Sequence, residues 1–328
     1  MPRLWPSRRL TAAGLIASLA IGGFALAQET VIRVDVNLVR VLATVKDQNG
    51  ALVGGLNRDD FEIHDNGAKQ EIAVFERQTE QPLRFALLID ESGSTAKEKR
   101  YEIDAIQRFF KALLDSGNPD DSVAIFSFNY EVRKQNHFTR NIRTLEQSLK
   151  RLKPEAGTSL YDAIYLASEE LEGRDGRKVI LIVTDGGDTT STYDFHKALE
   201  AAQLADAVIY SVLVVPIKNS AGRNVGGENA LATLGMRTGG RVFVPSGGPA
   251  LDEAFRNILD ELRTQYLIGF YPKDVPLSKD RFHTLTVKTM NPNLRVSSRN
   301  GYYGETEPEY QSTPGTVTVR PRKSERKN

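Results

Sequence analysis

The chain has 328 residues, and its 43 Lys and Arg side chains nearly balance its 42 Asp and Glu side chains. This balance argues against a generally basic nucleic-acid-binding surface, and the length is enough for roughly two domains of about 150 residues each. The chain contains no Cys, which excludes disulfides and thiolate chemistry and leaves a packed core or a metal ion as the source of its stability.

The N-terminus has the order of a secretory signal peptide. Arg3, Arg8 and Arg9 precede an apolar stretch at residues 10–26, and Ala25-Leu26-Ala27 places small residues two apart before Gln28. We therefore predict a signal peptide over residues 1–27, cleaved after Ala27, with a retained N-terminal anchor as the alternative. The protein is expected to be exported, to a periplasm, to the cell surface or to the medium.

Residues 28–80 predict a small immunoglobulin-like β module. The segment VIRVDVNLVRVLATV, residues 31–45, alternates β-branched and polar side chains. Further on, Asp65-Asn66-Gly67 lies between two short strand patterns, residues 61–64 and 72–75. An Asn-Gly pair between such runs is a strong signal for a β-hairpin.

Residues 83–264 predict a doubly wound, mostly parallel α/β sheet of the Rossmann-like class. Continuous apolar runs, typical of strands covered on both faces, occupy residues 85–90, 122–128, 178–185 and 207–215. Helical patterns separate them, and alternation of strand and helix favours a parallel sheet. Residues 131–138 follow the second strand too closely for a crossover, so we expect an antiparallel edge strand there.

Residues 265–304 return to short β-strand patterns broken by prolines. We expect these strands to pack with the N-terminal module into one small β-sandwich, with the α/β domain inserted between its two halves. Residues 305–328 are polar and end in RPRKSERKN. This composition predicts a disordered tail whose basic residues are solvated.

Oxygen-bearing side chains gather where the predicted parallel strands end. Asp90, Ser92 and Ser94 follow the first strand, Thr158 precedes a helix, and Asp185 follows a later strand. Ligands of open α/β sheets bind at the carboxyl ends of the strands, and Mg²⁺ is bound by a few carboxylates together with other oxygens. The pattern therefore predicts a site for Mg²⁺, with Mn²⁺ or Ca²⁺ as alternatives.

These five positions resemble the metal-ion-dependent adhesion site of von Willebrand factor type A domains. The resemblance covers roughly residues 83–263, and the flanking β segments are similar to those of a group of bacterial exported proteins related to that domain. It implies that Ser92 and Ser94 ligate the metal directly and that Asp90 and Asp185 bind it directly or through water. Thr158 would join the ligands once a partner is bound.

The same resemblance implies a protein-binding module and not an enzyme. A partner protein would supply an Asp or Glu carboxylate to the open coordination position. Neither a nucleic acid nor a small-molecule substrate is expected. In physical terms, a cation with few anionic ligands retains positive charge that attracts an incoming carboxylate.

Three other interpretations stay open at this point. The hydroxyls of Ser92, Ser94 and Thr158 are also typical of helix N-caps. Ser94-x-x-Lys97, followed by Ser127-x-Asn129 and Arg237-Thr238-Gly239, approximates the motif order of exported penicillin-binding serine enzymes. In that hypothesis Ser94 is an acyl-transfer nucleophile and Lys97 its partner. The third possibility is a purely structural cation with recognition by the β module.

Overall fold

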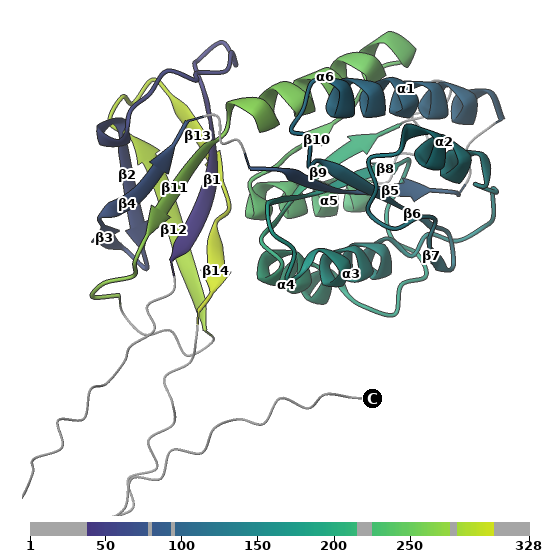
Figure 1. The fold of residues 1–328 in the computed structure, drawn as a ribbon. Helices are drawn as coiled ribbons and strands as arrows, with labels where there is room; N and C mark the ends of the chain where they lie inside the picture. Colours follow the sequence, from purple (N-terminus) through teal and green to yellow (C-terminus); the bar gives the residue numbers. More distant parts are fainter. Residues whose placement is uncertain (1–37, 78–80, 93–95, 215–224, 276–280, 305–328) are drawn as a thin grey trace, which may run out of the picture. The chain divides into compact units, whose positions relative to one another are not determined.

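The computed structural model describes residues 38–77, 81–92, 96–214, 225–275 and 281–304 (Figure 1). The predicted signal peptide, the predicted tail, the strand pattern at residues 31–37 and Ser94 lie outside the described residues. No helix in the described ranges is both long enough and apolar enough to cross a membrane.

A six-stranded sheet forms the centre of the α/β part, in the order β10-β9-β8-β5-β6-β7. Every neighbouring pair is parallel except β6 and β7, which are antiparallel. The strands are β5 (Leu83–Asp90), β6 (Ser122–Phe128), β7 (Val132–Lys134), β8 (Arg177–Thr184), β9 (Ala207–Leu213) and β10 (Val242–Phe243). The predicted doubly wound fold is confirmed, and the antiparallel edge strand is present but shorter than expected.

Helices cover both faces of this sheet. One face packs against α1 (Ala96–Asp115), α2 (Ile142–Lys150) and α6 (Gly248–Thr264), and the other against α3 (Leu160–Leu171), α4 (Phe195–Leu204) and α5 (Val225–Thr238). Side chains of β5 alternate between the two cores, since Phe85, Leu87 and Ile89 enter the first and Ala86 and Leu88 the second. Because both faces are dry, the strand reads as a continuous apolar run.

Two four-stranded sheets make up the β part, in the orders β13-β1-β11-β4 and β14-β12-β2-β3. The strands are β1 (Val39–Lys46), β2 (Phe61–Asp65), β3 (Ala68–Gln70), β4 (Ile72–Glu76), β11 (Tyr266–Phe270), β12 (Phe282–Thr289), β13 (Arg295–Ser298) and β14 (Gly301–Tyr303), with a short 3-10 helix at Arg58–Asp60. Each sheet pairs strands that precede the α/β segment with strands that follow it, and one apolar core lies between the sheets.

The hairpin at Asn66-Gly67 forms, but its second strand is not the predicted one. Both turn residues have positive φ, 46° for Asn66 and 84° for Gly67, as a two-residue hairpin turn requires. This tight turn places β3 (Ala68–Gln70) opposite β2. The chain then crosses to the other sheet, where β4 pairs with β11. The pattern at residues 72–75 is therefore a strand, in a different sheet from the one expected.

The backbones of Gly240 and Ile209 lie close together at the edge of the central sheet, so a substitution at Gly240 tests the packing there. A Cβ atom on Gly240 would lie 2.1 Å from the carbonyl oxygen of Ile209 in β9. We expect Gly240→Ala to lower the free energy of unfolding by about 1–3 kcal/mol, because β9 or β10 must move. Equilibrium urea unfolding measures this.

Gly55→Ala is the matched control for that substitution. A Cβ atom on Gly55 would have no atom within 4 Å, so a change within about 0.5 kcal/mol is expected. Equal stability of the two variants would contradict the packing described for Gly240.

Candidate metal site at the strand ends

Asp90 is the buried centre of the candidate site. It ends β5, and only 4% of its surface is exposed. Its Oδ2 atom accepts a hydrogen bond from Thr184 Oγ1 at 2.6 Å, and its Oδ1 atom accepts one from the backbone N–H of Ser92 at 2.9 Å. Asp90 therefore joins the end of β5 to the end of β8 and fixes the start of the loop that carries Ser92.

Burial raises the pKa of the Asp90 carboxyl above its usual value. The hydrogen bonds from Thr184 and Ser92 and the charge of Lys99 act in the opposite direction and only partly offset the desolvation. Lys99 donates from Nζ to the carbonyl oxygen of Asp90 at 2.6 Å. An ionised Asp90 is thus short of stabilising charge, which a bound cation would provide.

Thr158 brings a second hydroxyl to the same place. Its Oγ1 atom donates to Ser92 Oγ at 3.2 Å. Its backbone N–H donates to Thr189 Oγ1 at 2.9 Å, and its carbonyl oxygen accepts from the Thr189 N–H at 2.9 Å. Thr158 is therefore held against the loop that follows β8, with its hydroxyl directed at Ser92.

The loop after β8 is fastened to the start of α3. Ser191 Oγ accepts hydrogen bonds from the backbone N–H groups of Tyr161 at 3.0 Å and Asp162 at 3.1 Å, and it donates to Asp188. Asp162 in turn accepts from the N–H of Thr192 at 3.0 Å. Asp162 and Asp188 thus connect the loop after β8 to the start of α3.

These contacts make the capping interpretation of Thr158 wrong. The N-cap residue of α3 is Ser159, and the described contacts of Thr158 Oγ1 lead to Ser92 and not to the first turn of the helix. Ser191 binds two of the first-turn amides instead.

The structure links three of the five predicted ligands by hydrogen bonds, namely Asp90, Ser92 and Thr158. Asp185 is half-buried and directly follows Thr184 at the end of β8, and Ser94 lies outside the described residues. Within the described ranges, no group of three or more His, Cys, Asp or Glu side chains is placed to hold a metal ion. Any cation here would depend on hydroxyl and water oxygens beside two carboxylates, a donor set that suits Mg²⁺.

Thr184 is the contact that the sequence interpretation missed. It stands in Thr184-Asp185-Gly186, where the sequence pattern indicates the carboxylate as a ligand and gives no role to the preceding hydroxyl. A hydroxyl at the last position of a buried strand, beside a second strand that ends in Asp, is the signal that could have identified it.

The hydrogen bond from Thr184 to Asp90 makes a testable contribution to stability. In EDTA at pH 7, Thr184→Val should lower the free energy of unfolding by about 1–3 kcal/mol, since a buried carboxylate loses a donor. The bond favours the ionised form of Asp90, so its contribution is present above the raised pKa of that group and lost below it. Urea unfolding at several pH values should show the loss shrinking as the pH falls.

Thr184→Ser retains the hydroxyl and serves as the control. It should lose less stability than Thr184→Val at pH 7 and show little dependence on pH. A loss for Thr184→Val that stays constant from pH 7 to acid would contradict the charge-assisted hydrogen bond.

Part of the α/β segment is similar to a known domain family. The model of the von Willebrand factor type A domain matches residues 85–187. An uncharacterised protein from Synechocystis sp. is 27% identical over 109 residues, which is 32% of this chain and 25% of that protein. The chain therefore spans about a quarter of the length of that relative.

Two solved structures are similar to the chain. The von Willebrand factor domain of a type V pili tip protein from Porphyromonas gingivalis has a TM-score of 0.44 and 15% identity, covering 55% of this chain and 94% of that one. An aerotolerance-related membrane protein from Bacteroides fragilis has a TM-score of 0.42 and 18% identity, covering 55% and 98%. The α/β segment of this chain carries, over residues 85–187, the sequence pattern of the von Willebrand factor type A domain.

Proposed function

We propose that the protein is an exported binding module that holds a divalent cation at the strand ends and uses it to capture a carboxylate of a partner protein. The ligands would be Asp90, Ser92, Ser94, Thr158 and Asp185, and the cation Mg²⁺, with Mn²⁺ or Ca²⁺ as alternatives. The observation that carries the proposal is the meeting of the Thr158 and Ser92 hydroxyls beside the buried Asp90 carboxylate.

The composition of the ligand set explains why a carboxylate would be captured. Only Asp90 and Asp185 among the proposed ligands carry charge, so together they can at most balance the two positive charges of the cation. Any ligation through water weakens that balance. A carboxylate arriving from a partner would then form a short, charge-assisted contact with the metal.

Export is proposed from the N-terminal sequence. Arg3, Arg8 and Arg9, the apolar residues 10–26 and the small residues at Ala25 and Ala27 have the order of a signal peptide. The destination would be a periplasm, the cell surface or the medium. A protein partner at such a location suits a binding module better than a nucleic acid does, given the neutral charge balance.

The acyl-transfer alternative is weakened by two of its motif residues. Ser127 has no exposed surface, and its Oγ atom accepts a hydrogen bond from Gln135 Nε2 at 2.8 Å. Thr238 Oγ1 accepts from the backbone N–H of Ile209 at 3.0 Å, near the amino end of β9. Since parallel strands share their amino ends, Thr238 lies at the opposite edge of the sheet from Asp90. Failure of a labelled β-lactam to mark Ser94 would complete the case against this alternative.

Cation binding can be tested on the protein alone. Titration calorimetry should detect Mg²⁺ or Mn²⁺ binding to the wild type, and thermal unfolding should shift upward, by about 2.7 kcal/mol of stability at a cation concentration 100 times Kd. Asp185→Ala and Asp90→Ala should abolish both effects, because each removes one of two charged ligands.

Asp59→Ala is the control, since the Asp59 side chain is 93% exposed and belongs to the 3-10 helix of the β part. It should bind the cation like the wild type. Absence of heat and of a thermal shift in the wild type itself would refute the cation site.

A partner-binding experiment distinguishes cation-mediated capture of a partner from a cation with a purely structural role. Pull-down from envelope extracts is performed in Mg²⁺ and repeated in EDTA at a temperature where the metal-free protein stays folded. Cation-mediated capture predicts that partners are lost in EDTA and with Asp185→Ala. Partners retained under both conditions would instead favour recognition by the β module.

A further inference from the structure

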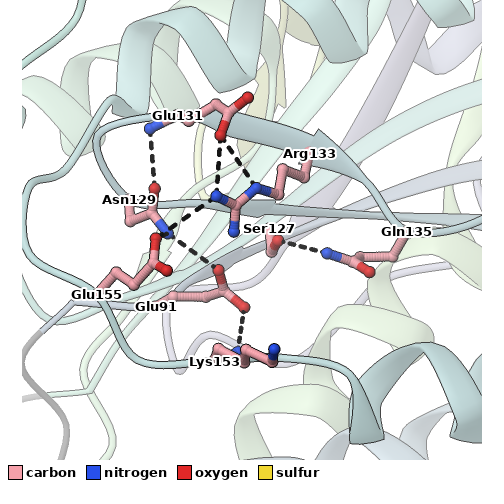
Figure 2. Close-up of polar contacts among 8 residues, drawn as sticks. All are labelled: Glu91, Ser127, Asn129, Glu131, Arg133, Gln135, Lys153 and Glu155. Carbon is pink, nitrogen blue, oxygen red and sulfur yellow. Dashed lines mark hydrogen bonds and ion pairs between the residues drawn. The ribbon is translucent and has the colours of Figure 1, made fainter.

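A cluster of polar side chains lies behind the loop that carries Thr158. It joins Glu91, which follows β5, to Asn129, which follows β6, and to residues 151–159 (Figure 2). Glu91 is 2% exposed and Asn129 is fully buried. Buried groups of this kind must be satisfied by hydrogen bonds, so their partners report what they hold in place.

Glu91 binds the beginning of the 151–159 loop. Its Oε1 atom accepts a hydrogen bond from the backbone N–H of Lys153 at 2.8 Å. Its carbonyl oxygen accepts from the N–H of Glu155 at 3.2 Å, and its own N–H donates to Phe128 at 2.9 Å. The side chain and the backbone of one residue thus fix two points of the loop to the end of β6.

Asn129 binds the end of the 151–159 loop and connects it to Glu91. Its backbone carbonyl oxygen accepts a hydrogen bond from the backbone N–H of Ser159 at 2.6 Å. Its Nδ2 atom donates to Glu91 at 3.3 Å and to Glu155 at 3.1 Å (Figure 2). Thr158, the neighbour of Ser159, is therefore held through Asn129 on one side.

Arg133 closes the outer side of the cluster. Its guanidinium lies 2.9 Å from a carboxylate oxygen of Glu131 and 3.5 Å from one of Glu155. Glu131 shares the cluster, but its side chain contacts Arg133 and its backbone N–H contacts Asn129. The described contacts of the Glu131 carboxylate do not reach the 151–159 loop.

From these contacts we infer that Glu91 and Asn129 are positioning residues for the Thr158 hydroxyl. They fix the 151–159 loop so that Thr158 Oγ1 lies within hydrogen-bond distance of Ser92 before a cation arrives. The cation affinity of the strand-end site then depends on Glu91, although Glu91 is not a ligand. This inference rests on the proposed cation site and names the residues that tune it.

Calorimetric titration with Mn²⁺ tests the inference on the full-length protein. Glu91→Gln keeps the size of the side chain but turns an acceptor into an amide donor facing the Asn129 amide. It should weaken Mn²⁺ binding by about 10–100-fold, the range found when groups supporting metal ligands are altered. Glu131→Gln makes the same chemical change in the same cluster and should leave Kd within about twofold.

A double variant separates positioning from a general loss of structure. If Glu91 acts through Thr158, then Glu91→Gln in a Thr158→Val background should weaken Mn²⁺ binding little further than Thr158→Val alone. Each protein is first shown to unfold cooperatively in EDTA. If Glu91→Gln does not fold, Glu155→Ala is used in its place. This substitution removes a hydrogen-bond acceptor of Asn129 on the more exposed side of the cluster, and Mn²⁺ binding should weaken several-fold.

Two results would overturn the inference while leaving the cation site intact. The first is a Mn²⁺ affinity equal to that of the wild type in Glu91→Gln, or in Glu155→Ala if that variant replaces it. The second is a double variant whose loss of Mn²⁺ binding free energy equals the sum of the losses in the two single variants. A wild-type protein that takes up no Mn²⁺ would overturn the cation site and this inference together.

Discussion

The carboxylate of Asp90 is the point on which the strand-end region depends. A charged group at 4% exposure is unfavourable unless donors surround it. Here the donors are the Thr184 hydroxyl and the Ser92 amide, and they come from two different strand ends. β5 and β8 are paired along their length, and the hydrogen bonds to this one carboxylate tie their ends to each other and to the following loop. Burial keeps the pKa of Asp90 above its usual value, because these donors only partly offset the desolvation of the carboxylate.

Thr158 is held in place by contacts on two sides. On one side its backbone pairs with Thr189 in the loop after β8. On the other side Asn129 binds the neighbouring Ser159, and Glu91 binds Lys153. The loop is thereby fixed to the residues that follow strands β5, β6 and β8, with its own Glu155 as one of the contacts. A hydroxyl held from both sides loses little freedom on binding, which favours affinity.

Much of the fold could be predicted from the sequence because its strands have clear signals. Continuous apolar runs identify buried parallel strands, and the carboxyl ends of such strands meet at one edge, so Asp90 and Asp185 could be assigned to the same edge of the sheet. The structure links Thr158 to Asp90 through Ser92. The pairing of β4 with β11 could not be predicted, because their registers join residues nearly 200 positions apart. The roles of Thr184, Glu91 and Asn129 were also missed, since a polar residue after a strand has the same appearance whether it caps, supports or is solvated.

The charge of the ligand set connects this architecture to recognition. A purely structural cation is best held by several carboxylates bound directly, whereas the two carboxylates of the proposed set can at most balance its charge and the hydroxyls add none. Such a set binds the cation less tightly but leaves it attractive to another anion. The weaker electrostatic hold must then be offset by geometry, because oxygens that are already in position require no rearrangement when the metal binds. The buried Glu91 and Asn129 side chains, joined to each other by a hydrogen bond, hold the 151–159 loop in one position and would supply that geometry without being ligands themselves.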